Sequence, residues 1–322
     1  AAAVEKLGIP TFLGGMARGL LGHKSDIQFR HKRSAALKAA DVVLVAGFPF
    51  DFRLSYGRSI NSKAVVISIN RSGLELRKNR RPTLAIRADA GQFLRALAYE
   101  MPKPYNKWDD WFEELRPNEM ARDQQIAAQA KEPKGCLDPL YICQHLEEGM
   151  DKKIVLVVDG GDFVATASYI VRPRAPLSWL DPGVFGTLGV GGGFALGAAV
   201  SRPGSEVWLI WGDGSAAYSL SEFDTYVRHG IPVIGLIGTD ASWAQIAREQ
   251  VEMLGTDVGT VLRRTDYHTV AEGYGGKGFL LDRIEDIPRV FREAKALARS
   301  GVPVLINAQI GKTDFRKGSI SI

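Results

Sequence analysis

The sequence predicts an α/β fold of two domains, each with a parallel sheet between helices. Short β-branched runs alternate with helical patterns along the whole chain, which is typical of parallel sheets and not of all-α or all-β folds. The chain has 322 residues, enough for two domains of about 100–200 residues each. Residues 101–137 contain several prolines and interrupt the alternation, so we expect them to link the two domains.

The first domain is expected to span residues 1–100. Its strand candidates are Pro10–Leu13, Val42–Ala46 and Val65–Ile69, and a helix is predicted at Ser34–Ala40. The chain opens on AAAVEKLGIPTF, which is typical of a helix end followed by a strand and carries neither a basic nor an apolar leader segment. We therefore expect this domain to be truncated at its start and the chain to be a fragment of a longer protein.

A charged helix is predicted around Trp108–Gln129, within the linker. The second domain, residues 138–322, begins with a predicted helix at Pro139–Glu148. Its predicted strands, with helices between them, are Ile154–Val158, Val207–Trp211, Val233–Ile237 and Val304–Ala308.

The composition narrows the classes of function. Lys and Arg exceed Asp and Glu by a net charge of +5, but no arginine-rich helix or interleaved aromatic motif accompanies them. We therefore expect small anionic ligands and no nucleic acid. Residues 183–200 carry no charge but contain seven glycines, so no transmembrane helix is predicted there. Cys136 and Cys143 are expected to be reduced thiols.

The most informative segment runs from Glu206 to Trp243. The apolar run Val207–Trp211 is followed by Gly212-Asp213-Gly214-Ser215, which we expect to be a turn whose glycines let backbone N–H groups approach a ligand. Ser219 and Glu222 match an S-x-x-E capping box, so a helix is predicted to begin there and to end near His229.

The next strand ends just before Asp240. Because a strand–helix–strand unit crosses over right-handed, Asp213 and Asp240 should converge at the carboxyl edge of the sheet, where open α/β sheets bind ligands. Two carboxylates with nearby main-chain carbonyls suit Mg²⁺, which completes its octahedron from water and substrate phosphates. The sequence therefore predicts a metal–phosphate site.

A dinucleotide site is the competing interpretation, because Gly212–Ala217 also fits G-x-G-x-x-A between a strand and a helix. Against it, Asp213 would place a negative charge beside a bare pyrophosphate unless a divalent cation lies between them. The residues favour the metal site without excluding the other.

These features resemble the thiamine diphosphate (ThDP) enzymes of the acetolactate synthase and 2-hydroxyacyl-CoA lyase group. The resemblance lies in the GDG motif with Asp240 placed 27 residues after Asp213, in VVDGGDFVATASY at 157–169, and in LDPGVFGTLGVGGGFALGAA at 180–199. It spans essentially the whole chain. It implies two Rossmann-like parallel-sheet domains of the ThDP-enzyme type, a middle domain and a diphosphate-binding domain.

By position, the resemblance implies that Asp213 and Asp240 hold Mg²⁺ with their side chains and Ser242 with its main-chain carbonyl. Gly186 would accept the pyrimidine amino group on its carbonyl, and Leu188 would be either the wedge that bends the cofactor or an ordinary core residue. The cofactor-binding set that the resemblance implies is Gly160, Gly161, Asp162, Gly186, Thr187, Leu188, Gly212, Gly214, Ser215 and Trp243.

The resemblance implies a ThDP- and Mg²⁺-dependent lyase that cleaves a 2-hydroxyacyl-CoA to formyl-CoA and an aldehyde one carbon shorter, as in fatty acid α-oxidation. An acetolactate synthase-type carboligase and a non-catalytic nucleotide-binding module stay open as alternatives.

In the family, the activating glutamate belongs to a pyrimidine-binding domain, which we expect from a second subunit of a homodimer or tetramer. This chain alone would then be inactive and carry no catalytic residue. Resemblance also implies the endoplasmic reticulum membrane, and the cytoplasm is the alternative.

Many relatives carry Asn-Asn where this chain has Thr239-Asp240. The added negative charge is tolerable beside a diphosphate if Mg²⁺ neutralises it, so we predict that chelation readily strips the cofactor.

Several assignments stay open. Trp243, Gln245 and Glu249 would either face substrate or belong to a helix with an exposed polar face, and the tail Thr313–Ile322 is a candidate for closing over the site.

The middle domain of relatives binds ADP or FAD, or only packs. Here Asp51 and Arg53 resemble a flavin-contacting segment, whereas Asn70 stands where an acidic residue often contacts the ribose.

Overall fold

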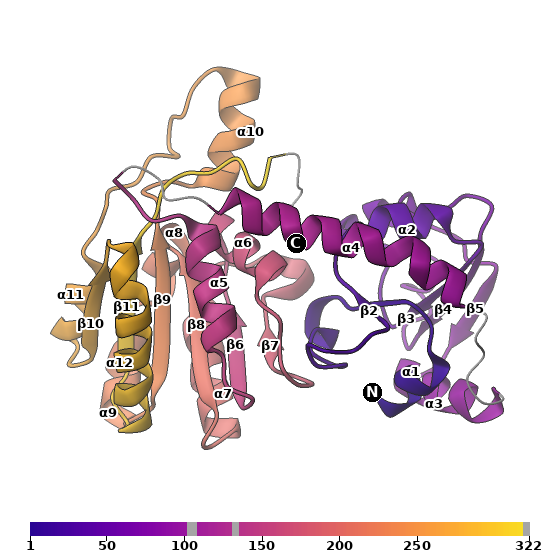
Figure 1. Ribbon diagram of the computed structural model, residues 1–322, viewed down its shortest axis with the longest axis horizontal. Coiled ribbons are helices and arrows are strands. Elements are labelled where there is room, and N and C mark those ends of the chain that lie inside the picture. The colour runs from indigo at the N-terminus through magenta and orange to yellow at the C-terminus, as the bar shows by residue number, and fades with distance from the viewer. Residues whose placement is uncertain (102–107, 131–134, 318–322) are drawn as a thin grey trace. The chain divides into compact units, whose positions relative to one another are not determined.

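The computed structural model of the protein describes residues 1–101, 108–130 and 135–317 (Figure 1). The described chain forms two compact units, the first made of residues 1–14 and 24–125 and the second of residues 15–23, 126–130 and 135–317. The division falls within helix α4 (Asp109–Gln129), which continues through Pro117. Pro102, Pro104 and Pro133 of the expected linker lie outside the described residues.

Two small parallel sheets form the first unit. Strands β3 (Val42–Ala46), β4 (Val65–Asn70) and β5 (Leu84–Arg87) pair in that order, and β1 (Thr11–Phe12) pairs with β2 (Gln28–Phe29). The predicted strands at 42–46 and 65–69 are confirmed. The strand expected at Pro10–Leu13 is shorter, since β1 comprises only Thr11 and Phe12. Strands β2 and β5 were not among the strands predicted from the sequence.

The other helices of the first unit are α1 (Ala2–Leu7), α2 (Arg33–Ala39) and α3 (Ala90–Glu100). The opening helix ends at Gly8, whose φ of 60° is a left-handed conformation that suits glycine. Asp89 begins α3 by accepting a hydrogen bond from the Gln92 N–H. The helix predicted at 34–40 is confirmed as α2, which begins and ends one residue earlier than predicted.

The second unit is built on a six-stranded parallel sheet with the order β10-β11-β9-β8-β6-β7. Its strands are β6 (Ile154–Val158), β7 (Trp179–Leu180), β8 (Glu206–Gly212), β9 (Val233–Thr239), β10 (Lys277–Leu281) and β11 (Val304–Gln309). The four predicted strands are confirmed and form the middle of this sheet. They are long apolar runs because both of their faces are buried.

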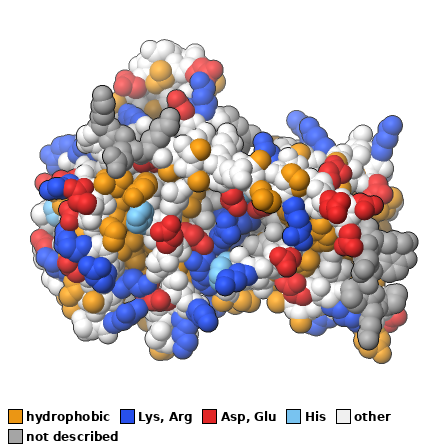
Figure 2. Space-filling model, viewed as in Figure 1, with side chains coloured by type: hydrophobic (Ala, Val, Ile, Leu, Met, Phe, Trp, Pro, Cys, Tyr) orange, Lys and Arg blue, Asp and Glu red, His pale blue; other side chains and the backbone are white. Residues whose placement is uncertain are grey.

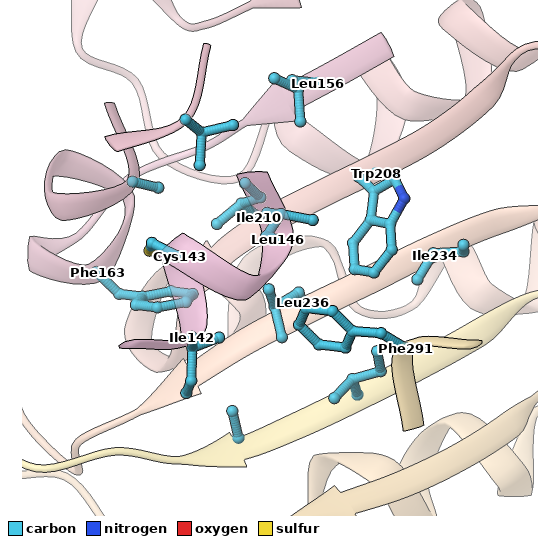
Figure 3. Close-up of a cluster of buried hydrophobic side chains, with 14 of the residues drawn as sticks. Ile142, Cys143, Leu146, Leu156, Phe163, Trp208, Ile210, Ile234, Leu236 and Phe291 are labelled. Atoms are coloured by element: carbon cyan, nitrogen blue, oxygen red, sulfur yellow. The ribbon is translucent and has the colours of Figure 1, made fainter. Parts of the chain in front are cut away.

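Helices cover both faces of this sheet. The covering helices are α5 (Pro139–Gly149), α6 (Asp162–Ile170), α7 (Gly191–Ser201), α8 (Asp213–Ser219), α9 (Glu222–His229), α11 (Tyr267–Gly273) and α12 (Ile287–Arg299). The remaining helix, α10 (Ala244–Leu254), has no buried residue and belongs to neither layer. Alternate residues of β6 enter two separate apolar clusters, Leu156 on one face and Val157 on the other. Figure 3 shows the first cluster, where the rings of Trp208 and Phe291 meet edge to face with centroids 5.2 Å apart.

Two local predictions are wrong. The Gly212–Ser215 segment is no turn, because β8 extends to Gly212 and helix α8 begins directly at Asp213. Ser219 does not cap the following helix. It is the last residue of α8, and its hydroxyl accepts a hydrogen bond from the Gly192 N–H at 3.3 Å. A tertiary contact thus uses the hydroxyl group that the capping pattern assigned locally.

Both cysteines are free thiols, with Cys143 buried in the core and Cys136 half-buried. Within the described residues, no helix combines the length and apolar character needed to span a bilayer. Side chains of both charge signs are interspersed over the face shown in Figure 2.

Candidate functional site

The candidate site lies where three neighbouring strands of the second unit end. Strands β6, β8 and β9 are adjacent and parallel, with Gly212 of β8 opposite Gly238 of β9. Their carboxyl ends therefore lie along the same edge of the sheet. Asp159 follows β6, Asp213 follows β8 and Asp240 follows β9.

The structure brings Asp213 and Asp240 into one site. One carboxylate oxygen of Asp213 accepts the Gly214 N–H at 2.8 Å, and the other accepts the Ala241 N–H at 2.8 Å. Asp240 accepts the Ser242 N–H at 3.0 Å, so the loop after β9 folds around its own carboxylate. Asp213, Asp240 and Ser242 are all buried. The three residues expected to hold a metal are thus buried together at the adjoining ends of β8 and β9.

Burial strongly disfavours the charges of this pair. Burial raises the pKa of Asp213 against the opposing effect of its backbone hydrogen bonds. Burial, and then the negative charge of Asp213, raise the pKa of Asp240 to about 7, although the Ser242 N–H and the Lys312 charge act in the other direction. Two carboxylates in a buried site repel each other, and a divalent cation between them removes that repulsion.

Glycines allow the β6–α6 turn and the end of β8 to touch. The Gly212 N–H donates to the Gly160 carbonyl at 3.0 Å, and the Ser215 hydroxyl donates to the same carbonyl at 2.8 Å. Gly161, with φ of 114°, lies so close to Gly212 that a Cβ on it would come within 3.1 Å of the Gly212 Cα. The backbone on both sides of the site is therefore held in a fixed position.

Trp243 lies directly over the start of α8. A Cβ placed on Gly214 would come 2.5 Å from the Cη2 atom of the Trp243 indole. The Trp243 N–H donates to the Thr260 carbonyl, which fixes the backbone from which the indole projects. Gly214 and Trp243, both predicted to contact the cofactor, are thus in mutual contact.

Gly186, Thr187 and Leu188 belong to the segment before α7, and Leu188 is the one shown in contact with the site. Gly186 has φ of 59° and, like Thr187, is exposed, whereas Leu188 is half-buried. The Leu188 side chain occupies the space beside Gly160 that a Cβ on Gly160 would fill. Leu188 therefore lies beside the β6–α6 turn, at the border of the site and not within the core.

The Asp162 side chain contacts α10. Its Oδ2 forms a 2.8 Å ion pair with Arg248, and the two side chains are only 10% and 17% exposed. Its Oδ1 is buried and has no hydrogen-bond partner among the described residues. The Asp162 carboxylate, which was predicted to line the cofactor, thus also attaches α10 to α6.

Helix α10 has an unexpected orientation. Arg248 points inward, whereas Ile246, Met253 and Leu254 are exposed, and Figure 1 shows the helix projecting from the strand ends. Gln245 is half-buried and Glu249 is exposed. The exposed face of α10 thus carries apolar as well as acidic side chains, and contact of Gln245 or Glu249 with substrate stays a prediction.

The C-terminal tail packs on α6 as far as the structure describes it. The Phe315 ring meets the Tyr169 ring edge to face, and the buried Arg316 guanidinium lies 4.9 Å from the centre of the same ring. Residues 318–322 of the predicted closing segment lie outside the described residues.

Sequence reasoning missed two polar residues at this edge. Asp159 accepts the N–H groups of Gly189 and Gly191, and burial raises the pKa of its carboxyl. Arg264 donates to the carbonyls of Thr239 and Ile310, which joins the ends of β9 and β11. A carboxylate directly after an apolar strand could have identified Asp159, as it did Asp213. No sequence pattern identifies Arg264.

The residues compared with a flavin-contacting segment are paired locally in the first unit. Asp51 and Arg53 form a 2.7 Å ion pair with each other, and the Arg53 guanidinium lies over the Phe48 ring. The Asn70 side chain accepts the Ser72 N–H. Nucleotide binding by this unit stays a prediction.

A polar cluster that the sequence did not reveal joins α4 to the end of β2. Glu119 accepts the N–H groups of Arg30 and His31, and the His31 ring lies 3.0 Å from an Asp123 oxygen. These contacts fasten α4 within the first unit.

The residues at the strand ends fit a magnesium-bound diphosphate. Two buried carboxylates with raised pKa values supply hard oxygen ligands, and glycine backbone on both sides permits close approach. A nicotinamide dinucleotide without a metal would instead place its pyrophosphate against both charges.

Comparisons with known proteins point the same way. A family model described as the C-terminal TPP binding domain of thiamine pyrophosphate enzymes matches residues 159–308, and the model of their central domain matches residues 1–97. Thiamine pyrophosphate is another name for thiamine diphosphate. Together the two models match about three quarters of the chain.

Curated relatives include 2-hydroxyacyl-CoA lyase 2 of Danio rerio, 50% identical over 99% of this chain and 52% of the relative, and of Homo sapiens, 49% identical over 100% and 52%. A probable acetolactate synthase of Mycobacterium bovis is 35% identical over 94% of this chain and 55% of the relative. The chain thus spans about half the length of these relatives.

Among solved structures, a Rhodococcus jostii thiamine diphosphate-dependent 4-hydroxybenzoylformate decarboxylase matches with a TM-score of 0.76 and 21% identity. The match covers 97% of this chain and 58% of that one, and it supports the fold.

Proposed function

Because the chain belongs to the thiamine pyrophosphate enzyme family, we propose that it forms part of a carbon–carbon lyase dependent on ThDP and Mg²⁺. The proposed substrate is a 2-hydroxyacyl-CoA, cleaved to formyl-CoA and an aldehyde one carbon shorter. The support for this substrate is the name shared by relatives that are about half identical over nearly the whole chain.

One structural observation carries the cofactor assignment. Asp213 and Asp240 are buried at adjacent strand ends, and the Ala241 N–H connects their loops. We propose that both carboxylates bind Mg²⁺ directly and that the main-chain carbonyl of Ser242 is a third ligand. Gly212, Gly214 and Ser215 would lie along the diphosphate.

When bound, ThDP supplies the electron sink that C1–C2 cleavage needs. The residues of this chain provide the framework. Gly160 and Gly161 border one side of the site, and Trp243 and the α8 backbone border another. Leu188, held beside Gly160, would limit the conformation that the cofactor adopts.

The pyrimidine side of the cofactor is proposed to bind a pyrimidine-binding domain of a second subunit, in a homodimer or tetramer. Apolar side chains near Gly186 support such a partner, since Phe185 is 87% and Val184 is 48% exposed. On this proposal, the activating glutamate is supplied by the partner subunit. Placement at the endoplasmic reticulum stays a prediction.

Cofactor binding is the first test of this function. Calorimetric titration of residues 1–322 with ThDP should show binding in Mg²⁺ and none in excess chelator. Asp213→Ala should abolish this binding. Glu206→Gln is the matched control, because Glu206 is a largely buried carboxylate at the start of β8, the opposite end of that strand. Binding of ADP alone, with no magnesium-dependent ThDP binding, would favour the nucleotide-binding module instead.

The reaction is tested with the partner half present. The portion of a 2-hydroxyacyl-CoA lyase 2 relative that this chain does not match is supplied in trans, with ThDP and Mg²⁺. Aldehyde and formyl-CoA should appear from a 2-hydroxyacyl-CoA. Because a probable acetolactate synthase is among the relatives, the same mixture is assayed separately with pyruvate. Acetolactate formation without lyase products would establish the carboligase alternative.

A further inference from the structure

Asp159 is a buried carboxylate at the end of β6 that the proposed metal site does not use. It is 3% exposed, and its backbone continues the pairing with β8 by donating to the Ile210 carbonyl. Its side chain turns toward the segment before α7. There it accepts the Gly189 N–H at 3.0 and 3.1 Å and the Gly191 N–H at 2.6 Å.

These hydrogen bonds replace a local helix cap. Val190 precedes α7 and offers no side chain that caps it. The N–H of Gly191, the first residue of α7, and the N–H of Gly189 just before the helix instead donate to Asp159, some thirty residues earlier in the chain. A charged acceptor of two N–H groups forms stronger hydrogen bonds than a neutral one.

Glycines make this close approach possible. Gly189 has φ of 87°, and a Cβ on it would come 2.6 Å from the Tyr218 Cβ. A Cβ on Gly191 would come 2.8 Å from the Asp159 carboxylate oxygen. The backbone at both positions is therefore shaped to fit against the carboxylate of Asp159 and its surroundings.

Leu188 is held from both sides as a result. Its backbone is adjacent to Gly189, which Asp159 binds, and its side chain fills the space beside Gly160, the residue after Asp159. Gly160 is itself fixed, since its carbonyl accepts hydrogen bonds from Gly212 and Ser215. The Asp159-Gly160 pair thus lies next to Leu188 on its backbone side and on its side-chain side.

We infer that Asp159 is a positioning residue that holds Leu188 at the border of the cofactor site. The inference rests on the proposed function, in which Leu188 limits the conformation that ThDP adopts while Asp213 and Asp240 hold the diphosphate through Mg²⁺. It follows that Asp159 acts on binding of the rings and not on binding of the diphosphate.

The test compares two ligands on the same chain. Asp159→Asn keeps the size of the side chain but removes its charge. With Mg²⁺ present, it should weaken ThDP binding about tenfold and change the affinity for inorganic diphosphate less than twofold. A purely structural role would weaken both equally, and that result would overturn the inference. Glu206→Gln should leave both affinities unchanged.

A second variant tests whether the effect passes through Leu188. Leu188→Ala should weaken ThDP binding by itself, and adding Asp159→Asn to it should cause little further loss. Additive losses would show that Asp159 acts by another route and would contradict the inference. Gly160→Ala, which displaces Leu188 without altering Asp159, should reproduce the selective loss of ThDP affinity.

A ligand-free measurement separates this inference from the proposed function. In Asp159→Asn, the amide protons of Gly189 and Gly191 should exchange at least tenfold faster, while those of α12 should not change. Unchanged exchange at the two glycines would overturn the inference, whatever the cofactor. If instead wild-type protein binds neither ThDP nor diphosphate while exchange responds as expected, the proposed function fails and the positioning contact stands.

Discussion

The main-chain N–H of Ala241 donates a 2.8 Å hydrogen bond to the side chain of Asp213. This bond attaches the loop after β9 to the end of β8, and Ala241 adopts a left-handed φ of 57° to make it. A non-glycine residue in that conformation costs about 1–2 kcal/mol, so the surrounding contacts must hold the loop in place. The consequence is that Asp240, the next residue back, is brought beside Asp213.

The affinity for ThDP in Mg²⁺ should depend on pH through Asp240. A metal ligand must be ionised, and the pKa of Asp240 is about 7 without a cation. Below that pH, wild-type affinity should fall up to about tenfold per pH unit. Asp240→Asn should retain or improve the affinity at neutral pH and flatten the profile. Calorimetry between pH 5.5 and 8 measures this, and complete loss of binding in Asp240→Asn would count against the assignment.

The same carboxyl should destabilise the metal-free fold at high pH. Because burial raises the pKa of Asp240 from 3.8 to about 7, the folded state binds its proton more tightly than the unfolded state does. Its contribution to stability is therefore present below pH 4 and lost as the pH rises to 7.

Urea unfolding in chelator measures this loss. Relative to wild type, Asp240→Asn should gain about 2–3 kcal/mol more in unfolding free energy at pH 8 than at pH 5. An equal difference at the two pH values would contradict the prediction.

The ion pair between Arg248 and Asp162 should contribute to stability as a pair. Arg248→Met leaves a carboxylate buried, so we expect a loss of about 2–3 kcal/mol in unfolding free energy. Adding Asp162→Asn should restore much of the loss. Arg228→Met is the control, since the Arg228–Asp224 pair is half exposed and should contribute about 0.5 kcal/mol or less. Urea unfolding tests all variants, and equal losses for Arg248→Met and Arg228→Met would refute the prediction.

Gly214→Ala should disturb the site through Trp243. The added methyl group would come within 2.5–2.7 Å of the indole, which must then move. We expect about tenfold weaker ThDP binding, because a side chain then occupies the approach to α8. Trp243→Phe in the same chain should recover part of the affinity. Gly197→Ala, which has open space around its added methyl group, is the control. Unchanged ThDP affinity in Gly214→Ala would show that this glycine is not needed there.

The strands that could be predicted are those whose residues are apolar throughout. β6, β8, β9 and β11 lie between two layers of helices, so nearly every side chain is buried and the runs are evident. β2 and β7 have only two residues each, too few to show any periodicity. β10, Lys277–Leu281, lies at an edge and begins with an exposed lysine, so its pattern is weak.

From the residue pattern alone, the candidate site could be predicted only where the order of strands and helices along the chain determines which residues meet. Asp213 and Asp240 each follow a strand, and the crossover rule brings adjacent strand ends together. The pairing of Arg248 with Asp162 depends on how α10 packs, which no local pattern records. The capping prediction at Ser219 was wrong for the same reason, because the Ser219 hydroxyl accepts the N–H of Gly192, a residue distant in the sequence.

Anomalous scattering from a crystal grown with Mn²⁺ and ThDP tests the central claim most directly. We predict one metal peak between Asp213 and Asp240, about 2 Å from an oxygen of each carboxylate and in contact with the cofactor diphosphate. A metal bound elsewhere, or a diphosphate bound far from both carboxylates, would contradict the account.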